Sequence, residues 1–178
     1  MKISFVIPCY CSEKTITGVV ERIEHVMEQL EGNTFEVILV NDCSRDGTWQ
    51  VIQGLAKEKK AVVAINLAKN VGQHGALLAG LNHISGELAV TLDDDGQTPI
   101  ENLPQMLAKL QEGYDVVSAK YVTRHQPSAF RRIGSILNKK MSRWLIERPE
   151  GVSVSVFLVM RQYIVNEMIR YKEPYPYI

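Results

Sequence analysis

Three consecutive aspartates, Asp93, Asp94 and Asp95, are the residues of this chain whose type and spacing point most directly to chemistry. They follow an apolar run, 88–92, that predicts a buried strand. Adjacent carboxylates repel one another, and water or a bound cation must relieve that repulsion. Because side chains alternate along an extended chain, Asp93 and Asp95 face one way and Asp94 the other. We therefore expect Asp93 and Asp95 to hold Mg²⁺ or Mn²⁺ with Gln97 as a third oxygen donor, the alternative being a solvated acidic turn.

The elements that would position these carboxylates alternate between strand and helix along the first 119 residues. Apolar runs predict strands over 3–7, where Pro8 ends the run, and over 35–40, 61–67, 88–92 and 116–119. Helical spacing predicts helices over 16–30, after the polar loop 41–48, after Gly75 and from Pro99. This alternation is typical of a mostly parallel sheet with helices on both faces. The polar loops after the first, second and fourth strands should then meet at the carboxyl edge of the sheet.

Charge is distributed unequally along the chain. Residues 1–119 hold nine Lys or Arg and 16 Asp or Glu, whereas residues 120–178 hold 11 and four. Residues 131–145 predict an amphipathic helix with a basic polar side, which is either a packed helix with a solvated face or a helix against an anionic membrane surface or lipid phosphate. One further strand over 152–159 and one further helix over 161–171 are predicted.

Composition excludes several classes of protein. A chain of 178 residues with 46% apolar and 22% charged residues is typical of one globular domain. No apolar stretch approaches 18 residues and no signal peptide is visible, so we expect a cytoplasmic protein with reduced thiols at Cys9, Cys11 and Cys43. The first strand is not followed by G-x-G-x-x-G, which excludes an NAD-type Rossmann domain. The basic part lacks interleaved aromatic residues, so no nucleic-acid partner is expected.

Four segments at the ends of the first four predicted strands resemble motifs of the family 2 glycosyltransferases, and within them the polyprenyl-phosphate sugar transferases, including dolichyl-phosphate mannose synthases. The segments are 7–13 (family pattern V-I-P-x-Y-N-E), 40–48 (V-D-D-x-S-x-D-G-T), 67–80 (L-x-R-N-x-G-x-x-x-A-x-x-x-G) and 93–101 (D-A-D-L-Q-x-P-P-E). The resemblance covers nearly the whole chain. It implies the GT-A fold, a Rossmann-like, mostly parallel sheet with helices on both faces, and metal-assisted transfer of a sugar from a UDP- or GDP-sugar to a polyprenyl phosphate.

The resemblance also implies roles for individual residues. It implies that the nucleotide-sugar is bound by Pro8, Tyr10, Glu13, Asp42, Lys69, Gly72 and Asp94. It implies that the metal is bound by Asp93, Asp95 and Gln97. It further implies catalytic roles for Asp93, Asp95, Arg131 and Arg132, with the two arginines near the acceptor phosphate. Lys69 stands where the family has Arg, and Asn41 replaces the first Asp of V-D-D.

The acceptor follows in part from the distribution of acidic residues. An alcohol acceptor needs a general base, whereas a phosphate, with a second pKa of about 6, is already largely dianionic at neutral pH. No Asp occurs after Asp115, so we expect a lipid phosphate that attacks in line with inversion at the sugar carbon. The segment 152–157 also lacks the acidic residue that many relatives carry there, and the chain stops at Ile178 where relatives usually continue.

We accordingly expect residues 1–178 to form a single, C-terminally truncated catalytic domain, with a nucleotide-binding half at 1–119 and a basic half at 120–178 that faces the acceptor or the inner surface of the cell membrane. Two other hypotheses stay open. One is a truncated, non-catalytic module that binds a nucleotide-sugar or an anionic membrane. The other is a phosphatase of the haloacid-dehalogenase type, which shares D-x-D but needs a second acidic cluster. The sugar, the nucleotide and the oligomeric state are not specified by the sequence.

Overall fold

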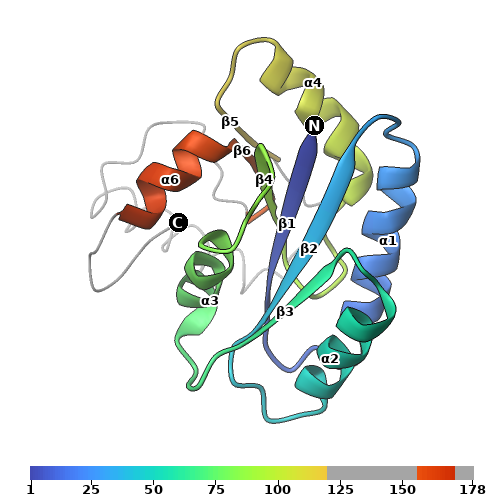
Figure 1. Cartoon of the computed structure of the whole chain (residues 1–178), viewed down its shortest axis with the longest axis vertical. Helices are drawn as coiled ribbons and strands as arrows, with labels where there is room; N and C mark the ends of the chain where they lie inside the picture. The colour runs from blue at the N-terminus through green and yellow to red at the C-terminus, as the bar shows by residue number, and fades with distance from the viewer. Residues whose placement is uncertain (120–155, 171–178) are drawn as a thin grey trace, which may run out of the picture. The chain divides into compact units, whose positions relative to one another are not determined.

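A six-stranded sheet is the framework of the part of the chain that the computed structural model describes, residues 1–119 and 156–170 (Figure 1). Its strand order is β3-β2-β1-β4-β6-β5. The strands are β1 (Lys2–Cys9), β2 (Thr34–Asn41), β3 (Val62–Asn66), β4 (Leu88–Thr91), β5 (Val116–Ser118) and β6 (Leu158–Arg161). Strands β1 to β4 pair in parallel, and β6 runs antiparallel to both β4 and β5. The prediction of a mostly parallel sheet is confirmed.

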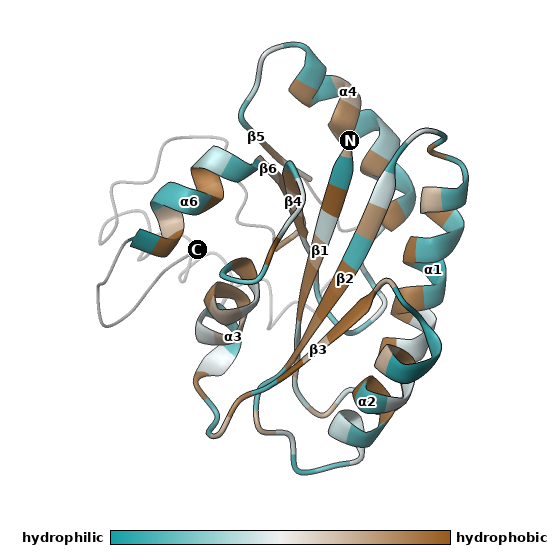
Figure 2. Cartoon of the chain, viewed as in Figure 1, coloured by the Kyte–Doolittle hydropathy of each residue, from teal (hydrophilic) through white to brown (hydrophobic). Residues whose placement is uncertain are grey.

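Helices cover both faces of this sheet, and a separate hydrophobic cluster lies between the sheet and the helices on each face. The helices are α1 (Ile16–Glu28), α2 (Thr48–Glu58), α3 (Gly72–Leu81), α4 (Leu103–Gln111) and α6 (Gln162–Arg170), and a 3₁₀ turn, η1 (Ile100–Asn102), precedes α4. Helices α1, α2 and α4 pack into one cluster, and α3 and α6 into the other. Because side chains alternate along β1, Phe5 and Ile7 enter the first cluster and Val6 the second. Figure 2 shows the strands as predominantly hydrophobic and the helices as mixed, as two-sided burial requires.

Strand β1 continues to Cys9, beyond the end predicted at Pro8. Proline has no backbone N–H and therefore usually interrupts an interior strand. The Cys9 carbonyl accepts the Asp42 N–H on the β2 side, so the preceding residue presents its nitrogen towards the β4 side. The ladder between β1 and β4 ends at Val6 on this strand. Pro8 thus lies beyond the ladder on that side, and its missing donor removes no ladder hydrogen bond.

Helix α3 begins at Gly72, four residues before the start predicted after Gly75. Gly72 has a left-handed φ of +80°, which glycine adopts without strain. The last turn of the helix requires a second glycine, because a Cβ on Gly80 would lie 2.4 Å from Cγ1 of Val6 and 2.9 Å from Cγ2 of Val40. These contacts let α3 approach the sheet closely, above the ends of β1 and β2.

Some predictions fall on residues outside those described. They are the basic helix over 131–145, with Arg131 and Arg132, and the part of the predicted strand that precedes residue 156. The strand β6 overlaps the end of that predicted run and lies in the sheet between β4 and β5. Across residues 1–119 and 156–170, no helix is long and apolar enough to cross a bilayer.

A buried carboxylate joins β1 and β2 to the loop before β4 at the amino edge of the sheet. Glu36 of β2 accepts hydrogen bonds from Ser4 Oγ at 2.6 Å, from Ser85 N at 2.7 Å and from Ser85 Oγ at 2.8 Å, and Lys2 Nζ lies 2.8 Å from its Oε2. Burial alone would raise the pKa of this carboxyl, but the donors Lys2, Ser4 and Ser85 outweigh burial and lower it to about 2. The group is therefore ionised and fully satisfied where β1 and β2 begin, just before β4.

We predict that Glu36→Gln lowers the free energy of unfolding at pH 7 by about 1–3 kcal/mol, since it leaves buried donors without a charged acceptor. The folded pKa of about 2 lies below the ordinary value of 4.5, so this stabilisation is complete above pH 4.5 and is lost as the pH falls towards 2. Urea denaturation at pH 7 and pH 3 measures the effect. The matched control is Glu28→Gln, because that carboxylate is 76% exposed. A stability difference that is equal at the two pH values contradicts the assignment.

Candidate functional site

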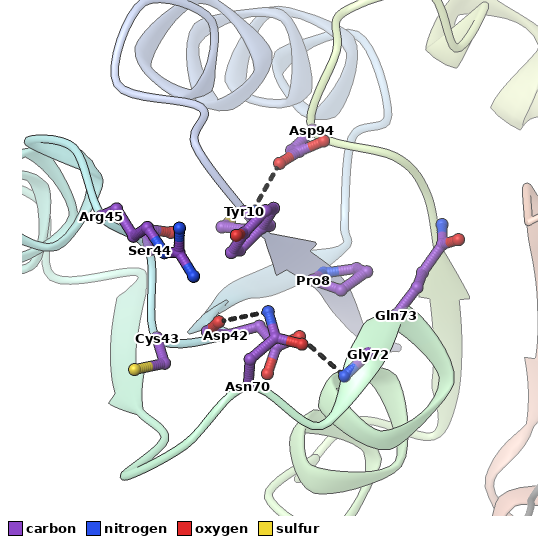
Figure 3. A pocket seen from close by; sticks show the side chains of 11 residues that line it. Pro8, Tyr10, Asp42, Cys43, Ser44, Arg45, Asn70, Gly72, Gln73 and Asp94 are labelled. Atoms are coloured by element: carbon purple, nitrogen blue, oxygen red, sulfur yellow. Dashed lines mark hydrogen bonds between the residues drawn. The ribbon is translucent and has the colours of Figure 1, made fainter.

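A cavity of about 770 Å³ opens at the carboxyl ends of the parallel strands (Figure 3). Its lining consists of Pro8, Cys9, Tyr10, Asp42, Cys43, Ser44, Arg45, Asn70, Gly72, Gln73 and Asp94. These residues come from β1, from the loops after β1, β2 and β4, and from the junction of β3 with α3. In the sheet, β2 and β3 lie on one side of β1 and β4 lies on the other, so the order of the strands reverses at β1. The cavity lies at this switch point, where open α/β sheets place ligands. The predicted meeting of the three polar loops is confirmed, and the loop after β3 joins them.

Asp42 lines the cavity and holds the loop that leads into α3. Its side chain accepts two backbone hydrogen bonds at the start of α3, from Val71 N to Oδ1 at 2.7 Å and from Gly72 N to Oδ2 at 2.9 Å. Asn70 Nδ2 donates to the Asp42 carbonyl at 3.0 Å. The first amides of a helix lack partners within the helix, and a carboxylate there is favoured by the helix dipole. Asp42 therefore shapes the wall of the cavity by fixing the β3–α3 loop.

Asp94 is the one aspartate of the three that lines the cavity. Its Oδ2 accepts the backbone N–H of Tyr10 at 3.0 Å (Figure 3). The Tyr10 side chain, which follows β1, is 48% exposed beside the cavity. The contact ties the loop after β4 to the loop after β1 and holds an aromatic ring next to the opening.

Asp93 is half-buried and interacts with α3. Gln73, in the first turn of α3, donates from Nε2 to Asp93 Oδ1 at 2.6 Å. Burial, followed by the negative charges of Asp95 and Asp94, raises the pKa of Asp93 above its ordinary value of 3.8 despite this hydrogen bond. Of the ion pairs formed between described residues, none includes any of the three aspartates.

The chemistry of these donors fits a divalent cation. The residues described contain no group of three or more His, Cys, Asp or Glu side chains arranged around a metal position. The predicted set of Asp93, Asp95 and Gln97 has only two carboxylates, which is the number Mg²⁺ commonly takes when substrate phosphates complete its shell. Oxygen donors suit Mg²⁺ and Mn²⁺, and such an ion relieves the repulsion of Asp93 by Asp95 and Asp94. The metal ligands themselves stay a prediction.

Of the other four residues predicted to bind the nucleotide-sugar, two line the cavity and two do not. Pro8 and Gly72 line the cavity. Glu13 and Lys69 are exposed and do not line it. The Glu13 carboxylate instead accepts the Gly47 N–H at 2.7 Å, directly before α2 begins. A role for these two residues in nucleotide binding stays a prediction.

Arg45 is a lining residue that the sequence interpretation missed, and it brings a positive charge to the cavity. It is exposed, and among the described residues that line the cavity it is the only cationic one. Figure 3 shows its side chain beside Ser44. The available signal was its place in the polar loop after β2, since loops at the carboxyl edge supply ligand contacts. In the same loop Cys43 lines the cavity with a left-handed φ of 54°.

Comparison with known proteins adds a family and a fold. The model of the family described as Glycosyl transferase family 2 matches residues 4–168. The mannosyltransferase PcManGT from Pyrobaculum calidifontis, in complex with GDP-Man and Mn²⁺, is similar with a TM-score of 0.65 and 18% identity over 93% of this chain and 46% of that chain. Mannosyl-3-phosphoglycerate synthase from Rubrobacter xylanophilus gives a TM-score of 0.70 and 17% identity over 92% of this chain and 54% of that chain.

A third similar structure is glucosyl-3-phosphoglycerate synthase from Mycobacterium tuberculosis in complex with Mn²⁺, UDP-glucose and phosphoglyceric acid. Its TM-score is 0.65, with 19% identity over 92% of this chain and 57% of that chain. At such identities the likeness establishes a shared fold. The chain spans about half the length of these solved structures.

Proposed function

The chain belongs to glycosyl transferase family 2 and has the GT-A fold, as its motifs predicted, and from this membership we propose that it transfers a sugar from a UDP- or GDP-sugar to an acceptor. The observation that carries the proposal is the cavity at the carboxyl edge, where Tyr10, Arg45 and Asp94 meet from three different loops. Its volume of about 770 Å³ lies within the range of small-molecule sites.

The donor would bind through its nucleotide. An exposed aromatic ring such as Tyr10 offers a face on which a base stacks, and the arginine Arg45 offers charge-assisted hydrogen bonds to an anionic or hydroxyl-rich group. The polar side chains of Ser44 and Asn70 add further hydrogen-bonding groups to the lining. Solved structures of similar fold contain GDP-Man or UDP-glucose, which supports a nucleotide-sugar donor here.

Asp93, Asp95 and Gln97 would hold Mg²⁺ or Mn²⁺. When bound, this ion stabilises the negative charge that grows on the departing nucleoside diphosphate. Gln73 orients Asp93 by its hydrogen bond, and Asp94 keeps the loop after β4 against β1. Manganese is present in two of the similar structures, which supports the choice of metal.

For the acceptor we propose a polyprenyl phosphate, bound near Arg131 and Arg132 at an anionic membrane surface. The support is chemical. A phosphate nucleophile needs no general base, and within residues 120–178 only four Glu residues could supply an acidic one. Attack in line with the departing diphosphate inverts the sugar carbon.

Metal-dependent binding of a nucleotide is the first prediction of this function. Calorimetric titration with UDP and with GDP is expected to show binding of one of them that requires Mn²⁺ or Mg²⁺. Asp95→Ala should weaken it by about tenfold or more, since a charged ligand to the metal is lost. The control is Asp115→Ala, whose carboxylate pairs with Arg161 instead. An affinity that EDTA leaves unchanged contradicts the metal assignment.

Arg45→Gln should weaken nucleotide binding by about tenfold at low salt and by much less at 1 M salt, because screening already weakens the charge interaction there. Titrations at two salt concentrations measure this. Lys57→Gln, which removes the same charge from the exposed end of α2, is the matched control. Equal losses for the two variants would assign the effect to net charge and not to Arg45.

Turnover with polyprenyl phosphate tests the acceptor, with 3-phosphoglycerate as the competing candidate. The expected product is a sugar linked to the lipid phosphate with the anomeric configuration inverted, assigned by NMR. A product with retained configuration refutes in-line displacement. Nucleotide binding without turnover on either acceptor favours the non-catalytic module instead.

A further inference from the structure

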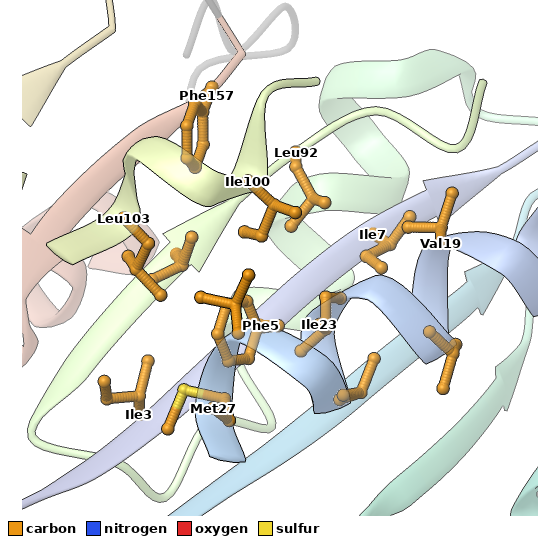
Figure 4. Packing of buried hydrophobic residues seen from close by; sticks show 14 of the residues in the cluster. Ile3, Phe5, Ile7, Val19, Ile23, Met27, Leu92, Ile100, Leu103 and Phe157 are labelled. Atoms are coloured by element: carbon orange, nitrogen blue, oxygen red, sulfur yellow. The ribbon is translucent and has the colours of Figure 1, made fainter. Parts of the chain in front are cut away.

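The loop that carries the predicted metal donors is a tight turn anchored at its far end. Gln97 N donates to Asp95 Oδ1 at 2.8 Å, and Gly96 between them has a left-handed φ of +74°. At the far end of the loop, Thr98 is 4% exposed and Ile100 is 2% exposed. Figure 4 shows Ile100 among the core side chains beside Leu92 and Leu103. Asp95 and Gln97 themselves are exposed.

Arg22 on α1 contacts the main chain of this loop. Nη1 donates to the Gly96 carbonyl at 2.6 Å, and Nη2 donates to the Thr98 carbonyl at 3.0 Å. The same guanidinium binds Glu101, from Nε to Oε1 at 3.1 Å and from Nη2 to the two carboxylate oxygens at 2.8 and 2.9 Å. The two carbonyls flank Gln97, so one planar group fixes the backbone on both sides of a predicted metal donor.

This network is more than a surface ion pair. An exposed Arg–Glu pair contributes little to stability, and the Arg22 and Glu101 side chains are 38% and 58% exposed. The guanidinium, however, is a rigid fork whose donors are satisfied here by three acceptors spread over six residues of loop. Helix α1 is itself fixed, because Val19 and Ile23 are buried in the core next to Arg22 (Figure 4). The loop is thereby held to a rigid element.

We propose that Arg22 is a positioning residue that holds the 95–101 loop so that Asp95 and Gln97 present their oxygens to the divalent cation of the donor complex. The inference rests on the proposed function. Ligand side chains must be held within a fraction of an ångström, and groups outside the ligand set commonly provide this. Lysine retains the charge but not the fork, so Lys at this position should not restore the geometry.

The test uses the full chain, Mn²⁺ and the nucleotide, UDP or GDP, that the wild type binds. The variants are Arg22→Gln, Arg22→Lys and, as control, Lys59→Ala, which breaks the 2.7 Å ion pair with Glu24 on another part of α1. Electron paramagnetic resonance measures bound Mn²⁺, and titration measures nucleotide affinity with and without the metal. We expect Arg22→Gln to weaken Mn²⁺-dependent binding by about tenfold, Arg22→Lys to recover only part of it, and Lys59→Ala to change neither.

A second measurement, independent of the metal, is amide hydrogen exchange over residues 93–102, which should accelerate in both Arg22 variants and not in Lys59→Ala. Unchanged exchange shows that Arg22 does not hold the loop and overturns the inference. Faster exchange with unchanged Mn²⁺-dependent binding also overturns it, as does an equal loss of binding with and without metal, which indicates a general effect on folding. If wild type itself shows no metal-dependent nucleotide binding, the proposed function fails and this inference with it.

Discussion

The carboxylate of Asp42 is the constraint on which the cavity depends. Its residue is only 3% exposed, and a charge removed from water must be compensated within the protein. The compensation comes from the amides of Val71 and Gly72, at the positive end of α3, so the buried charge and the helix stabilise each other. Since Asp42 directly follows β2 and the amides follow β3, the interaction closes one side of the cavity. The other side depends on the loop after β4.

Three adjacent aspartates can coexist because each is directed to a different donor. Asp93 accepts from the side chain of Gln73, Asp94 from the backbone of Tyr10, and Asp95 from the backbone of its own turn. These contacts join α3, the loop after β1 and the loop after β4, and they separate the carboxylates without neutralising them. Burial, followed by the repulsion that remains between the carboxylates, raises the pKa of Asp93. The site therefore combines a fixed geometry with an unbalanced negative charge, and both favour a cation.

Much of this arrangement was predictable, because it follows from periodicity along the chain. The order of strands and helices, and the meeting of the loops at one edge, required only local patterns and the rules of parallel sheets. The start of α3 at Gly72 was not predictable, since its cap is supplied by Asp42, 30 residues earlier. The same reason hid Arg22, whose acceptors lie 74 to 79 residues away. Residues whose partners are distant in sequence leave no local signal.

Glu36 at the amino edge of the sheet and Asp93 at the carboxyl edge differ in how far their charges are compensated. At the amino edge, Glu36 is surrounded by a lysine and two serines, and its pKa falls to about 2. At the carboxyl edge, burial and two like charges raise the pKa of Asp93 although Gln73 donates to it. A carboxylate whose donors are complete needs no further cation, whereas one that is crowded by like charges is stabilised by a cation. The protein thus compensates the charge of Glu36 at the edge that contributes to folding, and leaves Asp93 crowded by like charges at the edge where the strands open onto the cavity.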